Sequence, residues 1–380
     1  MTFIPFDLEY IQSTWEQVVD FNLTESGVHP ISLADLLAGD EEKLNRLLAT
    51  EINYPHVNGN PELRANIAGL YPNADGEQHV LVTVGAAEAN QIIMQTLLEP
   101  GDEVATLTPT YKQVWGIAAN NGHVVRPFHL RPDHPPQGKG WALDIDNLNT
   151  QVNDHTKLIA IVNPNNPTGY IMTDAEMDAI VAAADRVGAW ILADEVYRGA
   201  ERLQEAETPS FYGMYDKVLA LGSTSKAYGL PGLRIGWIVG PADTIEALWR
   251  RHEYTAITAT MMSNLLAEHA LSPEVRPRLI QRTRDYIRNG YPVMEAWMEE
   301  QDGLFSYTPP MASAVSFVRY HIDVNSTVLM ETLCREESVF VGSGDSFGMD
   351  GHLRISFGQD KVVLDEAFAR ISRCIQRLGG

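Results

Sequence analysis

A single lysine follows three small hydroxyl side chains in the stretch GSTSKAYGLPGLRIGWI, residues 222–238. Ser223 and Ser225 can donate hydrogen bonds to a phosphate, and Arg234 can bind one through its planar guanidinium. Lys226, placed beside that phosphate, can form a Schiff base with a carbonyl compound. Because a lysine is ordinarily a solvated surface charge, the function of Lys226 depends on what the rest of the chain places near it.

An acidic residue ends an apolar run elsewhere in the chain, where WILA is followed by DEVYRG. A carboxylate is costly to bury at that position unless a cation or a hydrogen-bond donor meets it. The cationic ring nitrogen of a pyridine would satisfy Asp194, although a helix N-cap is the ordinary role of such an aspartate. A phosphate clamp, an acid for a ring nitrogen and a lysine amine together indicate pyridoxal 5′-phosphate (PLP).

Two more loops follow strand-like runs. Gly85 opens GAAEA after HVLVTV, and the backbone N–H groups at the start of a helix form an anion site. NPNNPTG, residues 163–169, follows KLIAIV and offers the amide groups of Asn163, Asn165 and Asn166. Each loop alone could be an ordinary turn, so they indicate a site only in combination.

The elements that position these loops alternate between strands and helices from about residue 60 to 270. Strands are predicted at 79–84, 103–107, 123–128, 157–162, 190–193, 217–221 and 235–239, with helices at 86–98 and 174–188. Several of the strands are apolar throughout, which is typical of a sheet buried on both faces. The pattern predicts a largely parallel sheet whose ligand lies at the carboxyl ends of the strands.

The pattern changes after about residue 244. Helical tracts are predicted at 244–270 and 273–301, short strands at 314–320 and 352–357, and an amphipathic helix at 362–378. We therefore predict a small α+β domain after a large one. The predicted division is 1–45 for an N-terminal segment that joins the small domain and covers the active site, 46–270 for the large PLP-binding domain, and 271–380 for the small domain.

The motifs NPNNPTG, DEVY and STSKAYGLPGLRIGW resemble, in order and spacing, those of the class I/II aminotransferases among the fold-type I PLP enzymes. The resemblance extends over nearly the whole chain. It implies an α/β PLP-transferase fold, with a mostly parallel seven-stranded sheet flanked by helices and a smaller α+β domain. It also implies a homodimer with shared active sites and transamination between an α-amino acid and a 2-oxo acid through a Lys226 Schiff base.

The same resemblance implies a role for each catalytic residue. Lys226 matches the lysine that holds the cofactor and later moves protons as general base and acid. Asp194 matches the partner of the pyridine nitrogen, whose protonated form its carboxylate stabilises. Asn166 and Tyr197 match the groups that hydrogen-bond the cofactor's 3-hydroxyl oxygen.

Further matches surround this centre. Tyr111 matches the aromatic residue that stacks on the cofactor ring, and Tyr54 matches the tyrosine that reaches the phosphate of the other subunit. Arg354 matches the arginine that binds the substrate α-carboxylate, and Asn166 is a second candidate for binding the substrate. The implied phosphate ligands are Ser223, Ser225, Arg234 and the turn Gly85, Ala86 and Ala87 with its backbone N–H groups.

The N-terminal region departs from the usual pattern. Where many class I/II aminotransferases have a Gly-Glu-Pro-like stretch over the substrate, this chain has TESGVHPISLADLL, residues 24–37. This stretch is more similar to the branch that contains capreomycidine synthase, and PLP-dependent arginine oxidases also carry a glycine and a histidine here. Gly27 is thus a candidate for a backbone contact to substrate and His29 for proton transfer, with a surface or capping histidine as the alternative for His29.

Two other functions stay open. One is a PLP-dependent cyclase, eliminase or oxidase acting on an arginine-like amino acid, whose cationic side chain could meet acids such as Glu25 or Glu195. The other is a PLP-binding sensory domain of a transcription regulator, which the small number of residues before the predicted PLP domain and the acidic composition disfavour.

The charge balance argues against nucleic acid as a partner. The chain has 28 Lys and Arg against 50 Asp and Glu, a formal net charge of −22, whereas binding to phosphates or anionic membranes needs basic patches. We find no apolar run long enough for a membrane span and no secretory signal at the start, so a cytoplasmic location is expected. Cys334 and Cys374 are too few for a disulfide framework or a cysteine zinc site, and no metal is expected.

Overall fold

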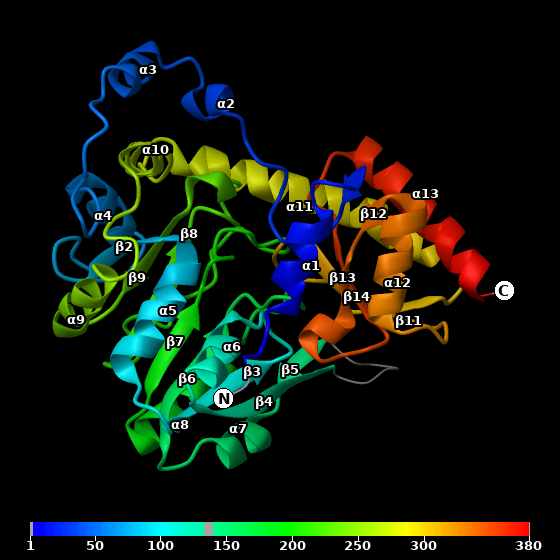
Figure 1. Cartoon of the computed structure of the whole chain (residues 1–380), viewed down its shortest axis with the longest axis horizontal. Coiled ribbons are helices and arrows are strands. Elements are labelled where there is room, and N and C mark those ends of the chain that lie inside the picture. Colours follow the sequence, from blue (N-terminus) through cyan, green and yellow to red (C-terminus); the bar gives the residue numbers. More distant parts are fainter. Residues whose placement is uncertain (1–2, 133–139, 380) are drawn as a thin grey trace.

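An eight-stranded sheet forms the centre of the molecule, whose computed structural model describes residues 3–132 and 140–379 (Figure 1). The strand order is β2-β9-β8-β7-β6-β3-β4-β5, and only β9 and β5 run against the direction of the others. The strands are β2 (Val80–Val84), β3 (Glu103–Thr108), β4 (Val124–Pro132), β5 (Trp141–Leu143), β6 (Thr156–Val162), β7 (Trp190–Asp194), β8 (Val218–Ser223) and β9 (Ile235–Val239).

All seven predicted strands of this sheet are present. The eighth, β5, was not predicted, because its three residues are too few to show a pattern. It pairs antiparallel with the end of β4, where Leu130 lies opposite Leu143. The sheet is therefore largely parallel, as predicted, with one short strand added at its edge.

Both faces of the sheet are covered by apolar side chains. Successive residues of β6 alternate between two cores: Ile159 and Ile161 pack with α8, whereas Leu158 and Ala160 pack on the opposite face, in the core that includes residues of α5, α6 and α9. Because neighbouring side chains of a strand point to opposite faces, burial of both faces requires an unbroken apolar run. This is why several of the predicted strands lacked alternation.

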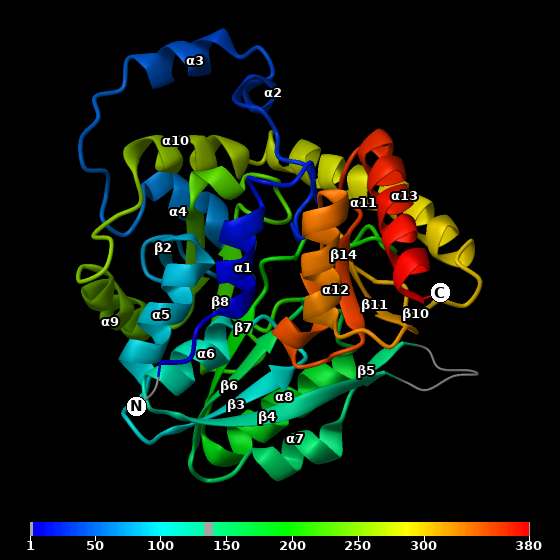
Figure 2. The same cartoon turned by 45° about the vertical axis from the view of Figure 1, so that its right-hand side comes forward.

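The helices lie on both sides of the sheet and around its edges (Figure 2). They are α1 (Asp7–Trp15), α2 (Leu33–Leu37), α3 (Glu41–Leu48), α4 (Pro61–Ala68), α5 (Gly85–Leu97), α6 (Gln113–Asn120), α7 (Ile145–Gln151), α8 (Asp174–Val187), α9 (Ala242–His252), α10 (Met261–Ala270), α11 (Arg276–Glu299), α12 (Ser326–Thr332) and α13 (Lys361–Gly379). The predicted helices at 86–98 and 174–188 correspond to α5 and α8.

The predicted helical tract at 244–270 is wrong in its middle. The structure has two helices there, α9 and α10, separated by the loop 253–260. Ile257 in this loop has a φ of +65°, which a helix excludes. The hydroxyl of Thr255 and the backbone N–H of Ala256 donate to the carboxylate of Glu88 on α5, so a tertiary contact replaces the helical bonds.

A second sheet lies beside the first, with the strand order β10-β11-β14-β13. Its strands are β10 (Phe305–Tyr307), β11 (Val315–Tyr320), β13 (Gly342–Ser343) and β14 (His352–Ser356), and a separate pair joins β1 (Phe21–Asn22) to β12 (Val339–Phe340) in parallel. The β1–β12 pair places the N-terminal segment against the C-terminal part of the chain. It fits an N-terminal segment that joins the small domain, whereas the bounds of the predicted division stay a proposal.

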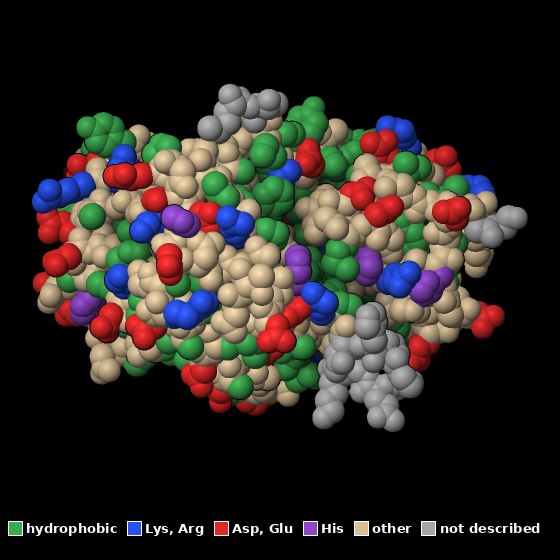
Figure 3. Space-filling model, turned by 90° about the horizontal axis from the view of Figure 1, so that it is seen from below, with side chains coloured by type: hydrophobic (Ala, Val, Ile, Leu, Met, Phe, Trp, Pro, Cys, Tyr) green, Lys and Arg blue, Asp and Glu red, His purple; other side chains and the backbone are tan. Residues whose placement is uncertain are grey.

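Charged side chains of both signs are interspersed over the face seen in Figure 3. Lys and Arg do not gather there into one basic area, in agreement with the acidic composition. None of the helices that the structure describes combines the length and the apolar character needed to cross a bilayer.

Candidate active site

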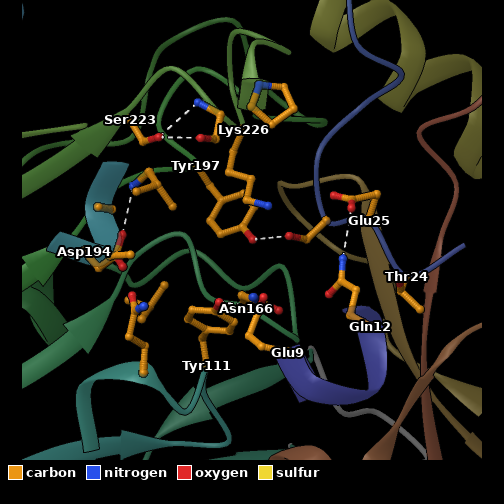
Figure 4. A pocket seen from close by; sticks show the side chains of 18 of the residues that line it. Glu9, Gln12, Thr24, Glu25, Tyr111, Asn166, Asp194, Tyr197, Ser223 and Lys226 are labelled. Carbon is orange, nitrogen blue, oxygen red and sulfur yellow. Dashed lines mark hydrogen bonds between the residues drawn. The ribbon is translucent and has the colours of Figure 1, made fainter. Parts of the chain in front are cut away.

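A cavity of about 440 Å³ opens at the carboxyl ends of β6, β7 and β8 (Figure 4). Val162, Asp194 and Ser223, the last residues of these three strands, all line it. Because parallel strands end at the same edge of the sheet, loops that are distant in sequence meet here. Residues of α1 and Arg354 of the second sheet form its other sides.

One end of the cavity is built to hold an anion. The Ser223 hydroxyl donates to Ser225 Oγ at 2.9 Å, and Arg234 Nη1 lies 3.4 Å from that same Ser225 oxygen. Across from them, α5 begins without a side-chain cap, so its first N–H groups are available to a ligand. Ala86 and Ala87 of this first turn line the cavity.

Gly85 allows this turn to lie against the arginine. Its φ is +71°, and a Cβ atom built there would lie 2.5 Å from Arg234 Nη2. The positive φ favours glycine, and the absence of a Cβ leaves the guanidinium room to lie against the turn. Hydroxyls, a guanidinium and uncapped amides therefore converge on one point, a donor set that fits the phosphate of PLP.

Asp194 is a buried carboxylate in the wall of the same cavity. Its side chain accepts a hydrogen bond from the backbone N–H of Val196, at 3.2 Å. Burial raises the pKa of Asp194 to about 6, against smaller opposing effects of the Val196 N–H, the Lys226 charge and the Asn90 side chain. A cation placed against this carboxylate would favour its ionised form, which fits a protonated pyridine nitrogen.

The remaining central residues lie between these two ends. Lys226, Tyr197 and Asn166 line the cavity, the tyrosine hydroxyl donating to Ser26 Oγ at 2.8 Å. Gly27 lies against the lysine: a Cβ atom there would be 3.3 Å from the carbonyl oxygen of Ser225 and 3.8 Å from Lys226 Cδ. The segment that carries Ser26 and Gly27 thus packs directly against the lysine.

Arg354 is a buried cation at the other end of the cavity. Its Nη1 donates to Asn166 Oδ1 at 3.0 Å and its Nη2 to the carbonyl oxygen of Thr24 at 2.7 Å. Its Nε, also buried, has no partner among the described residues, and burial lowers the pKa of the guanidinium. A buried donor without a partner is costly, so this group fits a carboxylate ligand.

An acidic wall formed by α1, its C-cap residue Glu16 and Glu25 was predicted from the sequence only in part. Glu9, Gln12 and Glu16 line the cavity together with Glu25. The Tyr111 hydroxyl donates to Glu9, and Gln12 Nε2 donates to Glu25 Oε1 at 2.9 Å. An N-terminal cover was expected and Glu25 was a candidate acid, but no motif indicated that Glu9, Gln12 and Glu16 would face the cavity.

Four predicted site residues do not line the cavity: Gly27 and Gly85 lie against residues that do, whereas His29 and Tyr54 do not. His29 is exposed, with Nδ1 3.3 Å from Gln359 Oε1 and its ring beside that of Tyr286. Its backbone holds it there, because the N–H donates to Gly358 and the carbonyl accepts from Arg282. Tyr54 is 81% exposed. In one copy of the chain, neither side chain contributes to the site, and for His29 the alternative of a surface histidine fits the structure better.

Comparison with known proteins agrees with this geometry. The family model described as aminotransferase class I and II matches residues 40–371. Capreomycidine synthase of Streptomyces vinaceus is 30% identical over 364 residues, which are 92% of this chain and 88% of that protein. Arginine–pyruvate transaminase AruH of Pseudomonas aeruginosa is 26% identical over 349 residues, 89% of this chain and 86% of that protein.

Among solved structures, a PLP-dependent aminotransferase from Streptococcus suis 89-1591 is similar to the whole chain. The two match with a TM-score of 0.92 and 30% sequence identity, and the match covers 100% of both chains.

Replacing Asp194 by asparagine should stabilise the protein in the absence of PLP at about pH 8. The pKa of this carboxyl is raised from 3.8 to about 6 in the folded chain. Its ionised form therefore destabilises the fold above pH 6, and this cost is lost as the pH falls through 6 toward 4. The difference between the two pKa values corresponds to ~3 kcal/mol in the free energy of unfolding. Thermal unfolding of both proteins at about pH 8 and about pH 5 measures this effect.

With PLP present, the wild type should instead be more stable than Asp194→Asn, because the neutral amide would not stabilise a cationic ring nitrogen. Asp185→Asn, at an exposed aspartate on α8, is the control and should change neither measurement. An Asp194→Asn variant that is no more stable than the wild type without PLP at about pH 8 would contradict this role of the buried carboxylate.

Proposed function

This chain belongs to the aminotransferase class I and II family, whose members depend on PLP, and we infer that it moves an amino group between an α-amino acid and a 2-oxo acid. The observation that carries this inference is that Asp194, Lys226 and Arg354 line one cavity. Asp194 ends β7, Lys226 follows β8, and Arg354 belongs to β14 of the second sheet. Only the folded chain brings these three side chains together.

Each of these residues has a defined task in that reaction. When bound, PLP supplies an electron sink for the pair of electrons released at the substrate Cα. Lys226 would hold the cofactor through Nζ and carry the Cα proton, and Asp194 would keep the ring nitrogen protonated. Arg354 would fix the substrate α-carboxylate, with Asn166 orienting its guanidinium.

Purified protein loaded with PLP should react with its amino donor alone, without a 2-oxo acid. Because the amino group then stays on the cofactor, one equivalent of 2-oxo acid should form per active site, accompanied by a change in the cofactor's absorption. A stopped-flow screen against the common amino acids and arginine derivatives measures both. Lys226→Ala should lose the covalent lysine–cofactor linkage, which borohydride reduction and peptide mass spectrometry detect in the wild type.

The matched control is Lys217→Ala, which removes a lysine just before β8 that donates to the carbonyl oxygen of Gly188 outside the cavity. It should retain the linkage. Survival of the linkage in Lys226→Ala would overturn the assignment of Lys226, and silence of the wild type with every amino acid would overturn transamination.

A second candidate function is a cyclase, eliminase or oxidase acting on an arginine-like amino acid. The specific observation is the acidic wall: Glu9, Glu16 and Glu25 line the cavity, and the salt bridges of the described residues reach none of them. A guanidinium side chain would be a complementary ligand for these carboxylates. The resemblance to capreomycidine synthase supports the same substrate class.

Glu25→Gln should weaken the use of arginine while leaving citrulline, its neutral isostere, unchanged. Loss of one hydrogen bond to a charged group corresponds to about a tenfold fall in kcat/KM. Steady-state or half-reaction kinetics with both amino acids measure the ratio, and product analysis separates a plain 2-oxo acid from a cyclised or oxidised product. Glu300→Gln, at the exposed C-cap of α11, is the control; equal losses for arginine and citrulline would contradict recognition of the cation by Glu25.

We also propose that the chain forms a homodimer through the segment that carries α3. Leu48, Ile52 and Tyr54 are 76%, 86% and 81% exposed, and α2 and α3 lie at the periphery of the molecule (Figure 2). Exposed apolar side chains in one segment are typical of an interface. The family resemblance implies that Tyr54 reaches the phosphate of the other subunit, so we expect a second copy of the chain to cover this surface.

Sedimentation equilibrium should give twice the 42.2 kDa of one chain. The double change Leu48→Asp and Ile52→Asp should shift the protein toward the monomer and reduce PLP retention, because Tyr54 would lose its partner site. Val362→Asp, at an exposed position of α13, should leave the mass unchanged. A wild-type protein with the mass of one chain would contradict the proposal.

A cytoplasmic location stays a proposal. It is supported by Cys334 and Cys374, which are buried and not joined to each other, since disulfides are rare in a reducing compartment.

A further inference from the structure

Glu88, in the first turn of α5, has a carboxylate that is bonded on both sides. Its Oε2 accepts from the backbone N–H of Val84 at 2.6 Å. Its Oε1 accepts from His252 Nδ1 at 2.9 Å, from the Thr255 hydroxyl and from the backbone N–H of Ala256 at 3.3 Å. The side chain of Glu88 is only 8% exposed, so its carboxylate is satisfied by these hydrogen bonds and not by water.

The bond to Val84 fixes the beginning of the phosphate-binding turn. Val84 is the N-cap residue of α5 and offers no side-chain cap. A serine or aspartate at that position would occupy the amides of the first turn, whereas Glu88 reaches back and satisfies the N-cap amide instead. Because Val84 has no capping side chain, the N–H groups of Ala86 and Ala87 are left to an anion, and the Thr83 hydroxyl holds the Gly85 carbonyl at 2.9 Å.

The bonds of the other carboxylate oxygen fix the turn to α9 and to the loop 253–260. His252 is the last residue of α9, and its side chain is fully buried. Burial raises the pKa of Glu88, but the hydrogen bonds from His252, Thr255 and the Val84 N–H together lower it further than burial raises it. The carboxylate is therefore ionised at neutral pH and can accept all four bonds.

We propose that Glu88 is a positioning residue for the cofactor, which holds the phosphate-binding turn in place by joining Val84 to His252 and the loop 253–260. The proposal rests on the assignment of the cavity as the PLP site. It also explains why the predicted helix at 244–270 is interrupted: Thr255 and Ala256 are held by Glu88 instead of continuing α9.

The geometry makes a specific demand on the side chain, because both oxygens must accept. A glutamine offers one acceptor and one donor, so its NH₂ group would face either the Val84 N–H or the donors of His252, Thr255 and Ala256. Glu88→Gln should therefore be no better than Glu88→Ala. Loss of one charge-assisted hydrogen bond corresponds to about a tenfold rise in the dissociation constant for PLP.

Equilibrium dialysis of the holoenzyme against graded PLP concentrations measures this constant, and thermal unfolding without PLP measures the stability of the chain separately. Glu246→Gln, on the exposed face of α9 where it pairs with Arg250, is the control and should change neither. A rise of more than about threefold in both Glu88 variants supports the proposal. A smaller change in either variant overturns it, even if the melting temperature falls, because Glu88 would then be merely structural.

If the Glu88 variants do not fold, variants of His252 test the proposal, with the same limit of about threefold on the dissociation constant for PLP. His252→Asn keeps a donor near the position of Nδ1 and should retain PLP, whereas His252→Leu removes the donor and should not. Equal retention by both overturns the proposal. Failure of the wild type to bind PLP would instead contradict the proposed function, so the two failures are distinguishable.

Discussion

A single buried guanidinium joins the three parts of the chain that surround the cavity. Arg354 belongs to β14 of the second sheet, Asn166 to the loop after β6 of the large sheet, and Thr24 to the N-terminal segment. A buried charge must be met by hydrogen bonds or it destabilises the fold by several kcal/mol. The position of each part is thus tied to the others through one side chain, and the cavity between them depends on that contact.

The polar groups around the cavity are incompletely satisfied by the chain itself. Arg354 Nε is buried without a partner among the described residues, and Asp194 has a raised pKa because burial penalises its charge. Such groups reduce stability in the absence of a ligand and are stabilised by a complementary one. Their positions, an acid at one wall and a guanidinium at another, match a cofactor ring nitrogen and a substrate carboxylate.

Rigid elements hold these groups at fixed positions around the cavity, whether or not a ligand is bound. The strands that end at the cavity are buried on both faces, so their ends are fixed by the cores beneath α5 and α8. The turn at Gly85 is held from behind by the hydrogen bond of Glu88 to Val84, and its missing Cβ leaves room for Arg234 on the cavity side. Preorganised donors of this kind bind an anion without the cost of ordering a loop.

Residue type and spacing were enough to predict most of the local elements and the cofactor. Short β-rich runs, several of them apolar throughout, predicted the seven longer strands, and Lys226, Asp194 and Arg234 indicated PLP because each side chain has a chemistry that the cofactor needs. Contacts between distant segments set the rest. The short strand β5 forms only because β4 extends far enough to pair with it, and the loop 253–260 replaces a helix because Glu88 holds its donors.

The same distinction holds within the site. His29 was a candidate from its place in the sequence, but two backbone hydrogen bonds hold it outside the cavity. Nothing local indicated that Glu9 and Glu16 line the cavity, because a short acidic amphipathic helix resembles any solvated surface helix until its packing is known. Residue chemistry is encoded locally, whereas the direction in which a side chain points depends on contacts between segments that are far apart in the chain.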